Sequence, residues 1–139
     1  MKQISIFLEN KKGRLAGVTE TLAKGEIDIK AMSLADTSDF GILRLIVDDS
    51  LRCLEILKTN EYVAQENEVI GVEIEDRPGG MNRVLEIFEN NGINIEYMYA
   101  TVERNKDYAI VIFRVDNQSE ALKVLAENNI TVAGNSDII

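Results

Sequence analysis

The two halves of this 139-residue chain repeat one another, and the repeat restricts the folds open to it. Most identities lie 66 positions apart in the first part of each half and 68 apart after a predicted hairpin loop. The two extra residues fall in that loop, where insertions are tolerated, so a duplication explains the pattern better than chance. The pairs are Gly13 with Gly79, Val18 with Val84, Glu20 with Glu86, Ile27 with Ile93, Ile29 with Ile95, Met32 with Met98, Val47 with Val115, Asp48 with Asp116 and Leu54 with Leu122.

Each half is predicted to form strand, helix, strand, strand, helix and strand. Alternating apolar residues indicate strands, and apolar residues three or four apart indicate helices. This order predicts an α+β protein of two ferredoxin-like βαββαβ units, each an antiparallel sheet with both helices on one face. The predicted strands are 4–8, 27–35, 40–47, 62–64, 69–75, 93–102, 108–115 and 130–132; the helices follow Gly13, Ser50, Gly80 and Asn117, and hairpin turns fall at 36–39 and 103–107.

The sequence also predicts how two of the helices are capped at their N-termini. Ser50 can cap the helix that follows it, and Asn117 with Glu120 three residues later resembles a capped start. Residues 65–68 form a short connection without proline or glycine, so the two units should be neighbours. In the strand 108–115, apolar residues occupy both faces. The uncovered sheet face should therefore meet another unit or another chain, most simply in a two-fold homodimer.

The most distinctive local motif is the turn from Asp76 to Met81, which follows an apolar strand and opens a helix. Pro78 fixes its own φ, while Gly79 and Gly80 place no Cβ between the backbone and its surroundings. The first N–H groups of the helix lack internal partners and lie at the positive end of its dipole, so they can receive a carboxylate. A tight turn that needs glycine for geometry alone would give the same pattern.

Composition excludes several classes of function. The net charge is −9, from 24 acidic and 15 basic residues. Nucleic-acid surfaces need a basic patch, so an RNA-binding ferredoxin-like domain is disfavoured, as is an anionic membrane surface. The apolar run at the N-terminus is too short for a signal peptide, and no stretch approaches the length of a membrane span. We expect a cytoplasmic protein.

The chain has no histidine and a single cysteine, Cys53. This removes histidine-based nucleophile pairs, histidine general bases and the usual zinc sites. The repeat aligns Cys53 with Ala121, which favours a small core residue over a reactive thiol. Asp76 and Glu96 are acidic, but no acid–base pair with a positioned partner is evident. We therefore expect no enzymatic activity, metal or cofactor.

The turn at 76–81, its helix and the following segment Gly92-Ile93-Asn94-Ile95 resemble the ACT domain, a small regulatory fold. The resemblance covers nearly the whole chain as two ACT units, residues 1–67 and 68–139. It implies allosteric binding of a free amino acid at an interface between paired units, through the glycine turn and a polar residue early in the next strand. In the second unit the implied ligand-binding residues are Asp76, Gly79, Gly80, Met81 and Asn94.

In the first unit the corresponding residues are Asn10, Gly13, Arg14, Leu15 and Asp28. This unit departs from the pattern, because Arg14 replaces Gly80 and Asp28 replaces Asn94. The arginine side chain enters the space where backbone should approach a ligand. It could instead help to hold a carboxylate, with Asp28 holding an ammonium group, or these charges could belong to a solvated turn.

The predicted function is that of a regulatory protein of tandem ACT domains that senses a free amino acid and modulates a separate enzyme of amino-acid metabolism. The alternative is a structural or oligomerisation module whose ligand site is vestigial. A binding screen of the free amino acids separates these two readings, because only a sensor binds one.

Overall fold

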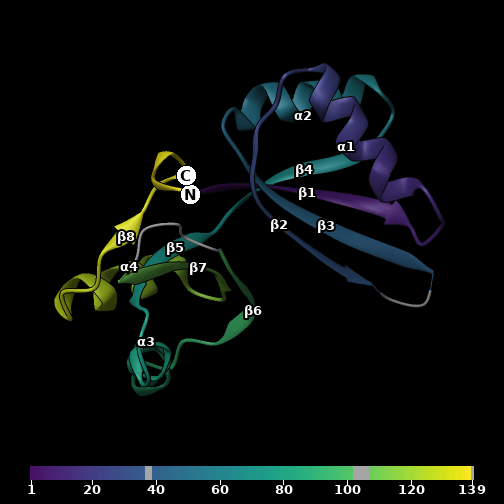
Figure 1. The fold of residues 1–139 in the computed structure, drawn as a ribbon. Coiled ribbons are helices and arrows are strands. Elements are labelled where there is room, and N and C mark those ends of the chain that lie inside the picture. Colours follow the sequence, from purple (N-terminus) through teal and green to yellow (C-terminus); the bar gives the residue numbers. More distant parts are fainter. Residues whose placement is uncertain (37–38, 102–106, 139) are drawn as a thin grey trace. The chain divides into compact units, whose positions relative to one another are not determined.

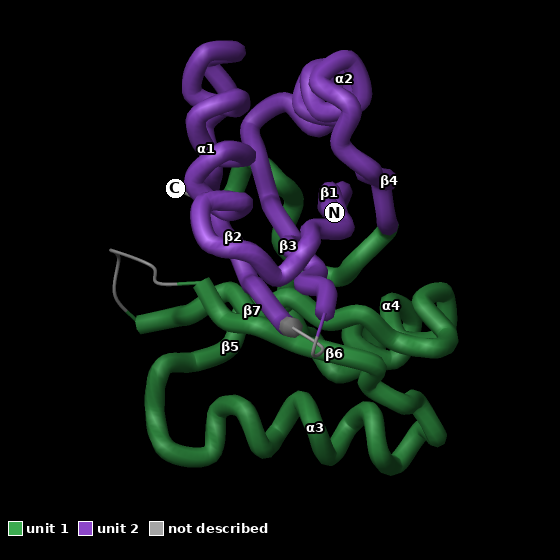
Figure 2. Tube along the Cα trace, turned by 90° about the vertical axis from the view of Figure 1, so that its right-hand side faces the viewer, with its two compact units in different colours: residues 1, 68–139 green, residues 2–67 purple. Residues whose placement is uncertain are grey.

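The computed structural model describes residues 1–36, 39–101 and 107–138, which form two compact units (Figures 1 and 2). In chain order we call Lys2–Asn67 the first unit, which is purple and keyed as unit 2 in Figure 2. Met1 with Glu68–Ile139 is the second unit, which is green and keyed as unit 1. Met1 belongs to the second unit, since its carbonyl oxygen accepts a hydrogen bond from the N–H of Val69 at 3.0 Å. Each unit is described by itself below.

In the first unit, two helices cover one face of a four-stranded antiparallel sheet with the strand order β2-β3-β1-β4 (Figure 1). Ile6 of the central strand packs with Val18 and Leu57 of the two helices in a single core cluster. The ferredoxin-like prediction is confirmed for this half. Its elements are β1 (Lys2–Glu9), α1 (Arg14–Lys24), β2 (Ile29–Asp36), β3 (Phe40–Val47), α2 (Ser50–Thr59) and β4 (Val63–Glu68).

The second unit repeats the arrangement with the strand order β6-β7-β5-β8. Its core places the rings of Phe88 and Phe113 edge to face, with centroids 5.3 Å apart. The tandem fold is therefore confirmed. The elements are β5 (Ile70–Glu75), α3 (Gly80–Asn90), β6 (Ile95–Ala100), β7 (Tyr108–Val115), α4 (Gln118–Glu127), β8 (Val132–Ala133) and a short 3₁₀ helix, η1 (Asn135–Asp137).

All four α-helices end with the same backbone device. The second residue after each helix takes a positive φ, and the N–H of the next residue donates to the carbonyl five positions back. After α3 these residues are Gly92, with φ 67°, and Ile93, which donates to Phe88 at 2.9 Å. Glycine in the left-handed position of this helix is confirmed. The other helices use longer residues there: Glu26, Glu61 and Asn129.

This device explains why four strands start later than predicted. The N–H of Ile27 donates to the carbonyl of Leu22 at 3.0 Å, so it closes α1 instead of joining a strand. Strand β2 consequently starts at Ile29, and for the same reason β4 starts at Val63, β6 at Ile95 and β8 at Val132. The predicted hairpin loops fall largely on residues 37–38 and 102–106, outside the described residues.

Two other predictions are wrong in detail. Residues 65–68 are not a free connection, because β4 continues to Glu68 and only Val69 separates it from β5. The cap of α2 is Asp49, whose Oδ1 accepts a hydrogen bond from the N–H of Arg52 at 3.0 Å, and Ser50 is the first helical residue. The capping role of Asn117 is confirmed, since its Oδ1 accepts from Glu120 N–H at 3.2 Å.

Candidate functional site

The glycine turn of the second unit connects β5 to α3 and is fixed mainly by backbone hydrogen bonds. The N–H of Asp76 donates to the carbonyl of Asp107 at 2.7 Å, and that of Arg77 donates to Glu75 at 2.9 Å. Gly79 then takes φ 89° at the N-cap position, where no side chain caps the helix. This φ favours glycine, so the residue is required by the turn whether or not a ligand binds.

Two backbone donors of this turn are open to a ligand. Gly80 N–H donates to Arg77 at 3.0 Å, and Arg83 N–H makes the first helical bond, to Gly79, at 3.1 Å. Between them, the N–H groups of Met81 and Asn82 have no acceptor among the described residues. A Cβ added at Gly79 would meet nothing within 4 Å, so the space beside the N-cap residue is open. This end of α3 can hold an anion.

Gly80 has a structural role that the sequence analysis did not identify. A Cβ at this position would overlap the carbonyl oxygen of Glu75, at the end of the preceding strand. The absence of a side chain therefore lets the helix start directly against its own strand. Because the N–H of Gly80 is already bonded, the donors for a ligand lie one and two residues further along, at Met81 and Asn82.

The turn of the first unit retains the same backbone pattern. Gly13 has φ 86° at the N-cap, and Gly17 N–H donates to its carbonyl at 3.0 Å. The N–H groups of Leu15 and Ala16 have no acceptor among the residues that the structure describes. The difference from the second unit therefore lies in the side chains around the turn, above all that of Arg14.

Glu9, at the end of β1, forms ion pairs with two basic residues of the first turn. Its Oε2 lies 2.9 Å from Lys11 Nζ and 3.6 Å from Arg14 Nη2. The hydrogen bond and positive charge of Lys11, followed by the charge of Arg14, lower the pKa of this exposed carboxyl. Asn10, beside it, donates its N–H to Asp39 at 2.9 Å.

Asn94 and Asp28 lie at the far end of their helices from the glycine turns. Asn94 N–H donates to Asp116 Oδ1 at 3.0 Å, and Asp28 N–H donates to Asp48 Oδ1 at the same distance. An α-helix rises about 1.5 Å per residue, so the eleven residues of α3 separate Asn94 from the turn by roughly 16 Å. One unit alone does not bring the two together. A site that uses the glycine turn of the second unit together with Asn94 must take Asn94 from another copy of the chain.

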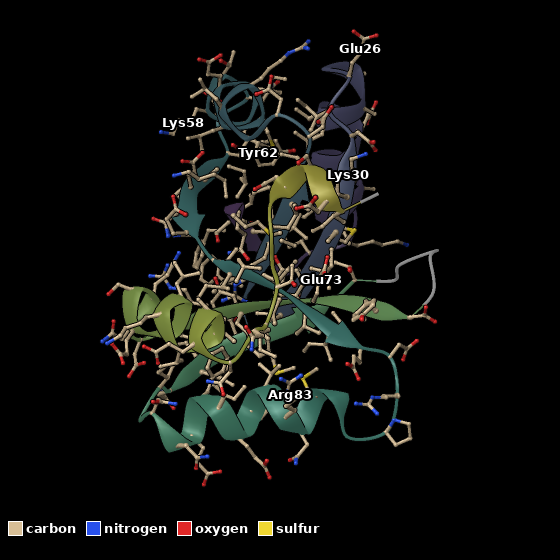
Figure 3. All side chains as sticks on the ribbon, turned by 90° about the vertical axis from the view of Figure 1, so that its left-hand side faces the viewer. Glu26, Lys30, Lys58, Tyr62, Glu73 and Arg83 are labelled. Atoms are coloured by element: carbon tan, nitrogen blue, oxygen red, sulfur yellow. The ribbon has the colours of Figure 1, made fainter. Side chains whose placement is uncertain are left out.

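A cleft of about 160 Å³ adjoins the glycine turn of the second unit. It is formed by the end of β5, the start of α3 and the segment before β8, and Figure 3 labels Glu73 and Arg83 from two of its walls. Arg83 Nη2 donates to the carbonyl of Asn128 at 3.1 Å, and Arg77 pairs with Glu75. The sequence analysis missed Asn129 and its neighbours here; the signal was the βαββαβ order, which places the last strand beside the first.

The first unit has a cleft at the equivalent place, with a volume of about 450 Å³. Its lining differs, since it includes Tyr62 where the second unit has Ile130, and Phe7 where the second unit has Glu73. A Cβ added at Gly17, the equivalent of Arg83, would lie 3.4 Å from the Tyr62 hydroxyl. The tyrosine therefore occupies space on this side of the first helix.

Cys53 is fully buried, as is its counterpart Ala121, which confirms the core role of this position. Burial, with the nearby charges of Asp48 and Asp49, raises the pKa of its thiol to about 11. In the described ranges, no three acidic or cysteine side chains cluster as metal ligands, and no helix is long and apolar enough to cross a membrane.

Comparison with solved structures supports the fold. Protein BT0572 from Bacteroides thetaiotaomicron is 40% identical, with a TM-score of 0.92 over 99% of this chain and 94% of that one. The regulatory subunit of aspartate kinase from Thermus thermophilus is 19% identical, with a TM-score of 0.66 over 91% of each chain. The corresponding subunit from Thermus flavus is 17% identical, with a TM-score of 0.63 over 91% of this chain and 90% of that one.

No curated protein sequence matched the chain. The family model described as the ACT domain pair, by contrast, matches residues 1–139, the whole chain. This match agrees with the duplicated fold, with the two left-handed glycines at equivalent turns, and with the family resemblance seen in the sequence. The chain belongs to the ACT domain pair family.

Proposed function

We propose that this protein is a regulatory subunit that binds a free amino acid at the glycine turn of its second unit. The ligand carboxylate accepts hydrogen bonds from the N–H groups of Met81 and Asn82. The observation that carries this proposal is the pair of N–H groups that find no acceptor in the described part of the chain, next to the open space at Gly79. Asn94 of another copy of the chain completes the polar contacts, because the Asn94 of the same copy is too distant from this turn.

The regulated protein in this proposal is a separate enzyme of amino-acid metabolism in the cytoplasm. The structural neighbours named as regulatory subunits of aspartate kinase support a regulatory role. Chemistry by the chain itself is not part of the proposal, since the described residues offer no metal cluster and the thiol of Cys53 is buried. The proposed assembly is a two-fold homodimer, which light scattering at micromolar concentration tests.

A thermal-melt screen of the proteinogenic amino acids at millimolar concentration tests the binding. A ligand at a hundred times its Kd, bound only to the folded protein, adds about 2.7 kcal/mol of stability. This should raise the melting midpoint by roughly 5–15 °C for a chain of this size. If no amino acid moves the midpoint, the ligand site is vestigial and the chain is a structural or oligomerisation module.

A matched pair of proline variants locates the site. Asn82→Pro deletes one proposed donor from the first turn of α3 without removing a backbone hydrogen bond, and it also removes the exposed bond from Asn82 Nδ2 to Glu86 Oε1. It should reduce the ligand-induced shift. Ala16→Pro makes the same change at the equivalent position of α1 and should leave the shift intact. Equal loss in both variants would contradict a site at the second turn. Gly80→Val is unsuitable as a test, because its side chain would collide with β5.

A further inference from the structure

The larger cleft, in the first unit, is not used by the function proposed above. It is bounded by the end of β1, the start of β3 and the segment that joins α2 to β4. Its volume of about 450 Å³ lies in the range of small-molecule sites. The lining is apolar on one side and charged on the other, which is the composition of a site for an amphipathic ligand.

The apolar side is built around two aromatic rings. Phe7 and Phe40 lie on adjacent strands of the sheet and stack with their centroids 4.8 Å apart and their planes 26° apart. Although stacked, they remain 49% and 41% exposed, and the neighbouring Val63 is 70% exposed. Phe7 alternates along β1 with buried core residues, so its ring lies on the sheet face away from the helices. Contiguous exposed apolar groups of this kind mark binding surfaces.

Three charged residues line the other side: Glu9, Arg14 and Glu61. Glu9 pairs with Lys11 at 2.9 Å and with Arg14 at 3.6 Å, and the guanidinium N–H groups of Arg14 that do not face Glu9 can bind an incoming carboxylate. Glu61 occupies the left-handed position after α2, and its carboxylate has no charged partner among the described residues. Together, Arg14 and Glu61 match the carboxylate and ammonium groups of a free amino acid.

The fold does not impose this composition. In the second unit the positions of Phe7, Phe40 and Val63 are held by Glu73, Tyr108 and Thr131, and the cleft there is about 160 Å³. Two copies of one fold therefore carry an apolar and a polar version of the same cleft. A wall of two half-exposed phenylalanines is thus a property of the first unit alone.

We propose that the first-unit cleft binds an amino acid with an aromatic side chain. The ligand ring packs against Phe7 and Phe40, where a third ring is favoured by its edge-to-face or offset contacts. Its carboxylate binds Arg14 and its ammonium group binds Glu61. This site is separate from the glycine turn of the second unit. The assignment rests on the proposed function only in that the ligand is a free amino acid.

Isothermal titration of the full chain with L-phenylalanine tests this assignment. L-Phenylalanine should bind, and 3-phenylpropanoate, phenethylamine and L-serine should each bind at least tenfold more weakly, since each lacks one of the three recognised groups. Phe7→Glu, which introduces the residue of the second unit, and Phe40→Ser should each weaken L-phenylalanine binding at least tenfold. Leu51→Ser, at an exposed apolar residue outside the cleft, should leave it unchanged.

Three results would overturn the assignment: no binding of L-phenylalanine at millimolar concentration, unchanged binding in both Phe7→Glu and Phe40→Ser, or equal weakening by Leu51→Ser. The Asn82→Pro variant distinguishes this site from the amino-acid site proposed at the glycine turn of the second unit. If L-phenylalanine binding is lost in Asn82→Pro and kept in Phe7→Glu, the second-unit site stands and the first-unit assignment fails. Loss of self-association in Phe7→Glu without any amino-acid binding would instead show that this cleft is a contact between copies.

Discussion

The two glycine turns share a backbone but differ at the residue that opens the helix. In the second unit this residue is Gly80, and a Cβ there would collide with the Glu75 carbonyl. In the first unit it is Arg14, which carries a full side chain and lies 3.6 Å from Glu9. At both turns two helix N–H groups have no acceptor within residues 1–36, 39–101 and 107–138. The difference between glycine and arginine therefore does not decide whether donors are present. It decides how closely the helix starts against its strand.

The clefts beside the turns show a second exchange. The first unit has a small residue on the helix, Gly17, and a large one, Tyr62, in the segment that follows α2. The second unit has the reverse, since Arg83 extends from the helix to the Asn128 carbonyl and the residue after the left-handed Asn129 is Ile130. The larger side chain therefore lies on the segment after α2 in the first unit and on helix α3 in the second unit, while the fold is the same. Equivalent positions in a duplicated protein are therefore best compared as pairs.

The largest effect that we expect tests the two cores. Phe88→Ala removes one ring of the edge-to-face pair at the centre of the second unit and should lower the free energy of unfolding by about 3–5 kcal/mol. Leu22→Ala, at the equivalent position of the first unit, should cost about 2–5 kcal/mol. Urea denaturation measures both. Glu86→Ala, on the exposed side of the same helix, is the control and should stay within about 0.5 kcal/mol.

A smaller effect tests the difference between the turns. Gly80→Ala places a methyl group against the Glu75 carbonyl and should destabilise the protein by about 1–3 kcal/mol, as overpacking does. Arg14→Ala is the matched change in the first unit and should change stability by no more than about 0.5 kcal/mol. The measurement is again the urea midpoint at constant slope. Equal effects of the two variants would show that the turns are packed alike.

The smallest effect concerns the charges of the first turn, where Glu9 pairs with Lys11 and Arg14, whereas Glu75 of the second turn pairs with Arg77. Glu9 should titrate below the ordinary pKa of a glutamate, so any stability it contributes is present above that ordinary pKa and is lost as the pH falls through its lowered value. Lys11→Met should raise this pKa, and Arg14→Met should raise it less, because Lys11 is the larger cause. NMR titration of the Glu9 carboxyl measures the shifts. Lys12→Met is the control, and a Lys11→Met variant without a shift would refute the interpretation.

The fold was predictable because the sequence carries it twice. The spacing from Gly13 to Gly79 aligned the two halves. The strands and helices predicted in one half then supported those predicted in the other. The strand starts were harder to place, because Ile27 and Ile93 are apolar and β-branched whether they pair in a sheet or close a helix. The extension of β4 was missed since Gln65 and Asn67 are polar and resemble a loop.

The site was only partly readable. The left-handed glycine follows from local rules, as do open N–H groups at the start of α3. The open donors are those of Met81 and Asn82, because the N–H of Gly80 is bonded to Arg77. The role of Gly80 depends on how close a carbonyl of the preceding strand lies, which sequence spacing does not specify. The clefts depend on sheet order, because β4 and β8 bring Glu61 and Asn129 beside strands some fifty residues away in the chain.

The end of α3 also bears on the chemical lifetime of the protein. Asn91 precedes Gly92. Asparagine deamidates when the backbone nitrogen of the next residue attacks its side-chain carbonyl, most readily where that residue is an unhindered glycine. Here both reaction partners are restrained, because Asn91 Nδ2 donates to the Ile87 carbonyl at 2.7 Å and Gly92 N–H donates to Glu89 at 3.1 Å. The bonds that end the helix thus protect its asparagine. Deamidation at this position should proceed mainly through the unfolded chain. Its rate would therefore measure how often the second unit unfolds.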